Sequence, residues 1–92
     1  MLTIVCSTKR GHHIRYIYIM SNLDKQFRIF LGRNIRQYRQ KQGISQERLG
    51  ELAKVHRTYV GMVERGEKNI TLQNMVRFAH ALGVKVRDLI DF

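Results

Sequence analysis

The chain contains no proline, only one cysteine and few acidic residues. Because proline is absent and 43% of the residues are hydrophobic, the composition is that of a globular protein and excludes a disordered one. A single thiol, Cys6, cannot form an intramolecular disulfide, which is typical of proteins of the reducing cytoplasm. No apolar run reaches the roughly 18 to 20 residues that span a bilayer, and the N-terminus lacks the order of charged, apolar and small residues found in signal peptides. We therefore expect a cytoplasmic protein without a membrane segment.

Groups that would support metal binding or catalysis are also missing. His12 and His13 are adjacent, His56 and His80 lie far apart, and none pairs with Cys6 at a ligand spacing. The glycines form neither a phosphate loop nor a dinucleotide fingerprint, and no serine, cysteine or carboxylate has a recognisable base partner. We expect no metal, no cofactor and no enzymatic activity. His56 is instead expected to cap or precede the helix that follows it.

Most of the charged residues in the chain are basic. Seventeen lysines and arginines stand against seven acidic residues, which gives a formal net charge of +10. This balance favours a polyanion as partner, either nucleic acid or an anionic membrane surface. The 92 residues are enough for one domain, which would bury about 60% of the surface that its unfolded chain exposes.

The stretch from about residue 45 to 65 contains two short helical patterns. Ser45 is a good N-cap for the first, residues 46–53, and the second covers residues 57–65. Only three or four residues separate the two patterns, which suits a helix-turn-helix corner. Gly50 lies where the two helices would cross most closely, so the absence of a side chain there has a steric purpose.

Polar side chains open the second of these helices. Arg57, Thr58 and Tyr59 lie at its exposed start, from which side chains reach base edges in a major groove. Two helices joined by a tight turn occur in any small helical protein, but this polar and basic opening favours DNA recognition. We therefore predict base contacts from these three residues.

An amphipathic helix is expected before the corner, with Ser21 or Asn22 as its cap and Gly43 at its end. Its apolar stripe recurs at spacings of four and three: Phe27, Leu31, Ile35 and Tyr38. The other faces carry several arginines, and such a face is usually solvated. One or two of them, with Arg36 as a candidate, would contact phosphate if this helix crosses the DNA backbone.

Two further helices are expected after the corner, separated by glycines at Gly66 and Gly83. Thr71 caps the first of them, whose apolar stripe contains Leu72, Met75, Val76, Ala79 and Leu82. The apolar residues of the short terminal helix are Val86, Leu89, Ile90 and Phe92. This is more apolar surface than one short terminal helix usually buries against its own domain. The terminal residues therefore form either a dimer seam or the last part of the monomer core.

Residues 1–20 differ in character from the rest. Their β-branched and aromatic segments, 2–6 and 14–20, are compatible with a two-stranded hairpin. An isolated hairpin is marginal in water and would need to dock on the helices, so disorder is the alternative. Met20 would make a natural start for a helical domain. We therefore divide the chain into an N-terminal extension, 1–20, and a helix-turn-helix domain, 21–92.

The segment from about Phe27 to Phe92 resembles the lambda-repressor-like helix-turn-helix domains, the phage-repressor type of DNA-binding module. The residues that carry the resemblance are ISQERLGELA, VHRTYVGMVERGEKNITL and NMVRFAHALGV. Within that family, the sequence of these segments is most similar to the controller proteins of restriction–modification systems. The resemblance implies an all-α, five-helix fold and a homodimer that binds a palindromic operator in double-stranded DNA.

The resemblance also implies roles for individual residues. Gln46, with Ser45 beside it, would bind a DNA phosphate at the start of the first helix of the motif. Lys68 and Asn69 would contact the DNA backbone or a base from the following loop.

Two other positions concern the fold itself. The resemblance places Arg39 and Glu64 in contact as an internal ion pair. Lys54 departs from the family, which usually has glycine at this point of the turn, often in the left-handed conformation. A lysine there costs on the order of 1 kcal/mol unless the turn is remodelled.

Together these features predict a sequence-specific transcription regulator, the controller of a restriction–modification operon. An antitoxin-type autoregulator that also binds a cognate toxin is one alternative. A membrane-surface binder that uses the basic N-terminal segment is another. No small-molecule effector is expected, because the chain has no room for a conventional ligand domain.

Overall fold

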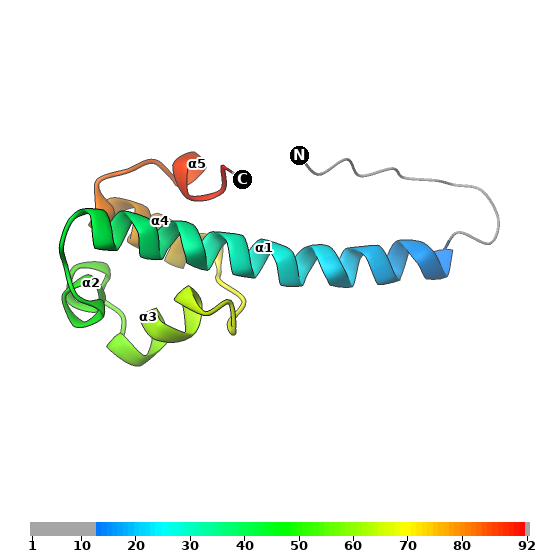
Figure 1. The fold of residues 1–92 in the computed structure, drawn as a ribbon, viewed down its shortest axis with the longest axis horizontal. Helices are drawn as coiled ribbons and strands as arrows, with labels where there is room; N and C mark the ends of the chain where they lie inside the picture. The colour runs from blue at the N-terminus through cyan, green and yellow to red at the C-terminus, as the bar shows by residue number, and fades with distance from the viewer. Residues whose placement is uncertain (1–12, 92) are drawn as a thin grey trace.

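The computed structural model describes residues 13–91, and the burial of side chains from Leu23 onward. This part of the chain forms five helices and no strand (Figure 1). The helices are α1 His13–Lys41, α2 Gln46–Ala53, α3 Arg57–Glu64, α4 Leu72–Leu82 and α5 Val86–Leu89. The all-helical fold predicted from the sequence is confirmed.

Helix α1 begins at His13 and runs for 29 residues, so it continues through the position of the predicted cap at Ser21. Residues 14–20, the predicted second strand of the hairpin, lie in this helix, and that prediction was wrong. Segment 2–6 lies outside the described residues. β-propensity depends on cross-strand neighbours, whereas a helix satisfies its own backbone groups. Neither proline nor glycine occurs between His13 and Gly32 to interrupt the helix. The first half of α1 projects beyond the other four helices (Figure 1).

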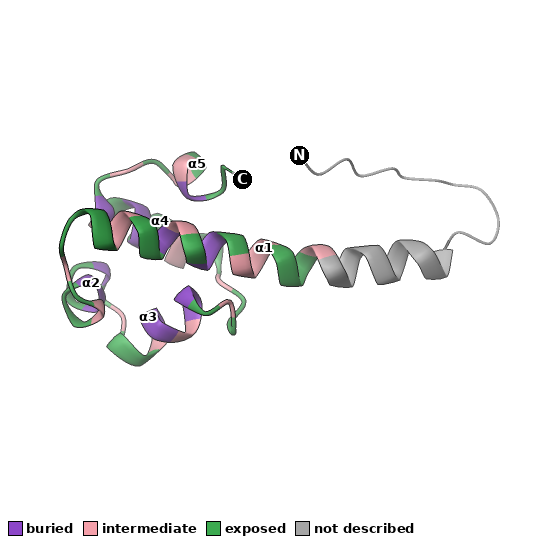
Figure 2. Ribbon diagram, in the orientation of Figure 1, coloured by how far each residue is buried: buried purple, intermediate pink, exposed green. Residues whose placement is uncertain are grey.

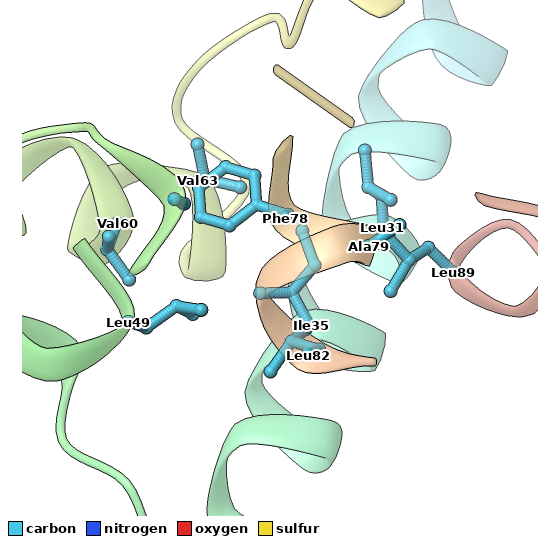
Figure 3. Packing of buried hydrophobic residues seen from close by; sticks show 10 residues of the cluster. Leu31, Ile35, Leu49, Val60, Val63, Phe78, Ala79, Leu82 and Leu89 are labelled. Carbon is cyan, nitrogen blue, oxygen red and sulfur yellow. The ribbon is translucent and has the colours of Figure 1, made fainter. Parts of the chain in front are cut away.

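The hydrophobic core lies where α1 and α4 meet the α2–α3 pair (Figure 2). Figure 3 shows side chains of α2 and α3, such as Leu49 and Val63, facing Phe78 of α4. The buried hydrophobic residues are Leu31, Ile35, Leu49, Ala53, Val60, Val63, Phe78, Ala79, Leu82 and Leu89. Residues 27 and 38, the ends of the predicted α1 stripe, are partly buried against this cluster. The stripe expected for this helix is therefore confirmed.

Helix α4 presents a different face to the core from the one expected. Phe78, which was not in the predicted stripe, is fully buried. Phe78, Ala79 and Leu82 form the face of α4 that points to the core. At 3.6 residues per turn, the side chains on the flank of that face then point to solvent. Leu72 and Val76 lie on that flank and are 67% and 50% exposed. Their assignment to the core stripe was wrong.

Helix α5 completes the core of the monomer. Leu89 is 0% exposed, and the side-chain amide of Asn34 in α1 donates to the backbone oxygen of Leu89 at 2.8 Å. Val86 is partly buried against the same core. Of the two roles left open for the terminal residues, Leu89 therefore takes the monomer core and not a dimer seam, because its own domain already covers the side chain. Ile90 stays 40% exposed, and residue 92 lies outside the described part.

Candidate nucleic-acid interface

Helices α2 and α3 meet at a tight corner. Lys54 adopts the left-handed conformation, with φ 60° and ψ 43°, and the backbone N–H of Val55 donates to Gly50 O at 2.9 Å. A Cβ atom on Gly50 would lie 2.8 Å from the oxygen of Val55. The glycine therefore lets the corner close, as expected. The turn is not remodelled around Lys54, so the backbone strain of a left-handed non-glycine residue, about 1–2 kcal/mol, is retained.

The first turn of α3 is held by His56. Its backbone is extended, and its Nδ1 accepts a hydrogen bond of 3.0 Å from the backbone N–H of Thr58. The expectation that this histidine caps the helix is confirmed. Because Nδ1 is the acceptor, the neutral ring carries its proton on Nε2. The cap fixes the direction in which the first residues of α3 leave the corner.

Arg57 and Thr58 stand exposed on this first turn. Nη1 of Arg57 lies 3.6 Å from Oε2 of Glu47, near the start of α2. Both side chains of this ion pair are well exposed, so it contributes little to stability and is easily exchanged for another partner. The structure thus leaves both predicted base-contacting side chains available at the surface.

Tyr59, the third predicted base contact, is placed differently. Its ring stacks on Phe78 with a centroid distance of 6.2 Å and an interplanar angle of 13°. Its hydroxyl accepts a hydrogen bond of 2.9 Å from Nδ2 of Asn74 in α4. The ring is therefore part of the packing that seats α3 on α4. No local pattern indicated this, because both partners come from a helix that lies later in the chain.

Arg39 of α1 and Glu64 of α3 form a bidentate ion pair, the contact that the resemblance implied. Nε of Arg39 lies 2.6 Å from Oε2 and Nη2 lies 3.0 Å from Oε1, while Nη1 donates to the backbone oxygen of Ile44 at 3.0 Å. The Glu64 side chain is only 3% exposed. The hydrogen bond to Glu64 raises the pKa of Arg39 above its ordinary value, since this bond and the carboxylate charge outweigh the opposing effect of burial.

The start of α2 is attached to this ion pair. Nε2 of Gln46 donates to Oε1 of Glu64 at 3.1 Å, so a predicted phosphate-binding side chain is held in place from inside the domain. Ser45 caps α2, with its Oγ accepting from the backbone N–H of Arg48 at 3.0 Å. These bonds leave the hydroxyl proton of Ser45 and the second amide proton of Gln46 as donors. The sequence indicated the cap but not the anchoring of Gln46.

Helix α1 crosses the end of α3 in close backbone contact. A Cβ atom on Gly32 would lie 2.2 Å from the backbone oxygen of Val63. Arg36 follows one helical turn later and is exposed, so it borders the face of α1 that packs on α3. The role of Gly32 was missed, because an isolated glycine within a helical pattern carries no sign of its neighbour.

The loop after α3 carries the last two predicted DNA contacts, Lys68 and Asn69, and both are exposed. Oδ1 of Asn69 accepts a hydrogen bond of 3.1 Å from Nη1 of Arg28 in α1. The structure therefore connects this loop to the first helix, which sequence reasoning did not anticipate.

Within residues 13–91, no three histidine, cysteine, aspartate or glutamate side chains gather as metal ligands would. Over the same residues, no helix combines the length and apolarity needed to cross a membrane.

Known proteins share both this sequence pattern and this fold. Residues 35–89 match the family model described as helix-turn-helix. Control protein C.BamHI of Bacillus amyloliquefaciens is 39% identical over 71 residues, which cover 76% of this chain and 88% of that protein. Control protein C.SmaI of Serratia marcescens is 45% identical over 60 residues, covering 65% of this chain and 71% of that protein.

Solved structures agree with these sequence relatives. The restriction-modification controller protein C.AhdI from Aeromonas hydrophila superposes with a TM-score of 0.66 at 40% identity, over 67% of this chain and 94% of that chain. The hypothetical transcription factor NHTF from Neisseria gives a TM-score of 0.69 at 40% identity, over 73% of this chain and 77% of that chain. With its exposed α3 start and its closed α2–α3 corner, the chain belongs to the helix-turn-helix family of DNA-binding transcription regulators.

Proposed function

We propose that this regulator is the controller of a restriction–modification operon and binds a palindromic operator as a homodimer. The observation that carries the DNA-binding part is the first turn of α3, where Arg57 and Thr58 are exposed on a helix capped by His56. The similarity to the control proteins C.BamHI and C.SmaI and to C.AhdI supports the controller role. The proposal includes no catalysis, cofactor or small-molecule effector, and it places the protein in the cytoplasm with its DNA.

Base reading is assigned to Arg57 and Thr58. The guanidinium of Arg57 has donors in a fork that matches O6 and N7 of guanine. Its ion pair with Glu47 is exposed and long, so exchanging that partner for a base requires little free energy. Tyr59 is assigned a supporting role, because its ring and hydroxyl are both engaged with α4.

Phosphate contacts would set the position of the protein on the duplex. The side chains proposed for these contacts have free donors or positive charge at the surface: Ser45, Gln46, Arg36, Lys68 and Asn69. Because Gln46 is bonded to Glu64, its amide already has a fixed orientation when DNA arrives. Contacts from prearranged groups bind more tightly, since less conformational freedom is lost on binding.

A second copy of the chain is the proposed occupant of the exposed apolar surface. Leu72 and Val76 of α4 are 67% and 50% exposed, and Ile90 adds a further exposed apolar side chain after α5. Pairing these surfaces would remove them from water and relate two α3 helices by a twofold axis. Such symmetry requires two inverted half-sites in the DNA.

Selection of bound sequences from a random DNA pool tests the proposal. We expect enrichment of an inverted repeat whose half-sites are centred about 10 to 10.5 base pairs apart, or a multiple of this distance. A methyltransferase or endonuclease gene beside the coding sequence would support the controller role. Absence of any enriched sequence would contradict base recognition, and an enriched asymmetric site would contradict the dimer.

A further inference from the structure

The loop of residues 66–69, which follows α3, packs on α1 at Arg28 and Ile29. Gly66 has φ +74°, and a Cβ atom on it would lie 3.0 Å from Cγ1 and 3.1 Å from Cα of Ile29. The glycine therefore allows the loop backbone to lie directly against α1. This contact fixes the first residue of the loop.

Arg28 connects the two ends of the same loop. Its Nε donates to the backbone oxygen of Gly66 at 3.3 Å, and its Nη1 donates to Oδ1 of Asn69 at 3.1 Å. The guanidinium is planar and its donors have fixed relative directions, so it also sets the distance between these two acceptors. Lys68 lies between the two attached residues and is exposed.

The contact with Arg28 also decides which way the amide of Asn69 faces. A guanidinium has only donors, so Asn69 must turn its oxygen toward it. The NH₂ group is then directed away from Arg28, and no acceptor in the described part of the chain bonds it. The group is therefore available to a hydrogen-bond acceptor of a partner molecule.

We infer that Arg28 is a positioning residue for DNA binding, which holds the 66–69 loop and presents Nδ2 of Asn69 as a donor to DNA. The acceptor is a phosphate oxygen or an acceptor on a base edge, since both would bond an amide N–H. This inference rests on the proposed function, because it assumes that the loop meets DNA. Arg28 acts through the loop, because its Nε and Nη1 groups donate to Gly66 and Asn69 at the two ends of that loop.

The test uses full-length variants Arg28→Ala and Arg28→Lys, with Arg33→Ala as the matched control. Arg33 is another arginine of α1, but its guanidinium lies 5.5 Å from the ring centre of Phe30 and not on the loop. Lysine keeps the positive charge of Arg28 and loses the two-point geometry. Two quantities are measured: operator affinity, and hydrogen exchange of the backbone amides of residues 66–69 without DNA.

We expect both Arg28 variants to weaken operator binding by about tenfold, as for loss of a prearranged contact, and to speed amide exchange in the loop. Arg33→Ala should change neither beyond about twofold. The double variant Arg28→Ala/Asn69→Ala should lose less affinity than the product of the two single-variant fold-losses, because Arg28 acts through Asn69. Wild-type affinity of Arg28→Lys would overturn the inference, and so would unchanged loop exchange in both Arg28 variants.

Asn69→Ala identifies the acceptor. An equal loss of affinity for operator and scrambled duplex indicates phosphate, and a loss confined to the operator indicates a base, each supporting the donor role. No loss on either duplex overturns it. The exchange experiment needs no DNA. If the wild-type chain selects no sequence, the proposed function fails, while the positioning of the 66–69 loop by Arg28 is still tested by hydrogen exchange.

Discussion

Nε2 of Gln46 lies 3.1 Å from Oε1 of Glu64, and the same carboxylate oxygen accepts a hydrogen bond from Arg39. The side chain at the start of α2 that is proposed to bind phosphate is thus bonded to the most deeply buried charge of the domain. One carboxylate joins three helices, α1, α2 and α3. Changes at Glu64 should therefore alter stability and the arrangement of the DNA-facing surface together.

Glu64→Gln should lower the melting temperature markedly. Removing one partner of a buried ion pair leaves Arg39 without its countercharge, which typically costs about 3–5 kcal/mol. Glu67→Gln is the control, because Glu67 pairs with Arg65 at the surface, where such a pair contributes little to stability. Thermal unfolding followed by circular dichroism compares the two variants. Equal and small shifts would show that the Arg39–Glu64 pair does not support the fold.

Lys54→Gly should stabilise the domain. The lysine is the one non-glycine residue with positive φ among those described, at φ 60°, and relieving this conformation is worth about 1 kcal/mol, less the greater entropy of glycine in the unfolded chain. Lys54→Ala removes the same charge and keeps the strain, so it should bring no such gain. Urea unfolding of both variants gives the difference in the free energy of unfolding. A gain for alanine equal to that for glycine would assign the effect to charge.

Arg57→Ala should reduce discrimination between DNA sequences. We expect a loss of about 1–3 kcal/mol per half-site on the operator and little loss on a scrambled duplex, because a base contact is removed. Titration of both duplexes at several salt concentrations measures these losses. Equal weakening on both duplexes would make Arg57 a phosphate contact.

Lys68→Ala should act on all sequences alike. Loss of one phosphate contact from each half-site would flatten the salt dependence of binding by roughly 2 for the dimer. The variant therefore serves as the counterpart of Arg57→Ala in the same titrations. An unchanged salt slope would remove Lys68 from the phosphate contacts.

Ile90→Asp should yield a monomer whose DNA binding is lost at low protein concentration. The substitution places a charge on the proposed dimer surface without disturbing the core. Leu52→Asp is the control, because Leu52 is exposed to the same extent, 40%, but lies on α2, away from the proposed dimer surface. Sedimentation velocity reports the oligomeric state of both variants. A dimer that persists in Ile90→Asp would place the interface elsewhere.

A chain that starts at Met20 should still fold cooperatively and bind the same DNA. The buried hydrophobic side chains among residues 23–91 all belong to residues 31–89, so the core that they form lies entirely within the shortened chain. Loss of Lys9, Arg10 and Arg15 should weaken binding modestly, through reduced positive charge. Circular dichroism melting and operator titration check both expectations. An unfolded or insoluble product would show that the N-terminal segment belongs to the domain.

Local signals in the sequence were sufficient for most helix boundaries. Ser45 and Thr71 cap their helices as predicted, and Gly43, Gly66 and Gly83 all have positive φ. These features depend on neighbouring residues along the chain, so their physics is contained in a short segment. The segment 14–20 is the exception. Its β-branched and aromatic residues favour a strand only where a partner strand is present to pair with it.

Contacts between distant segments were decided by the tertiary structure alone. The close approach of Gly32 to Val63, the bonds from Arg28 to Asn69, and the stacking of Tyr59 on Phe78 each depend on how whole helices are rotated and shifted against one another. Leu89 shows the same dependence, since its pattern fitted a dimer seam and a core equally well. By itself the sequence determined that an amphipathic α1, a helix-turn-helix corner and a basic, polar α3 start would exist. Packing decided which side chains remain exposed at the proposed DNA-binding surface, because burial depends on residues that are distant in the sequence.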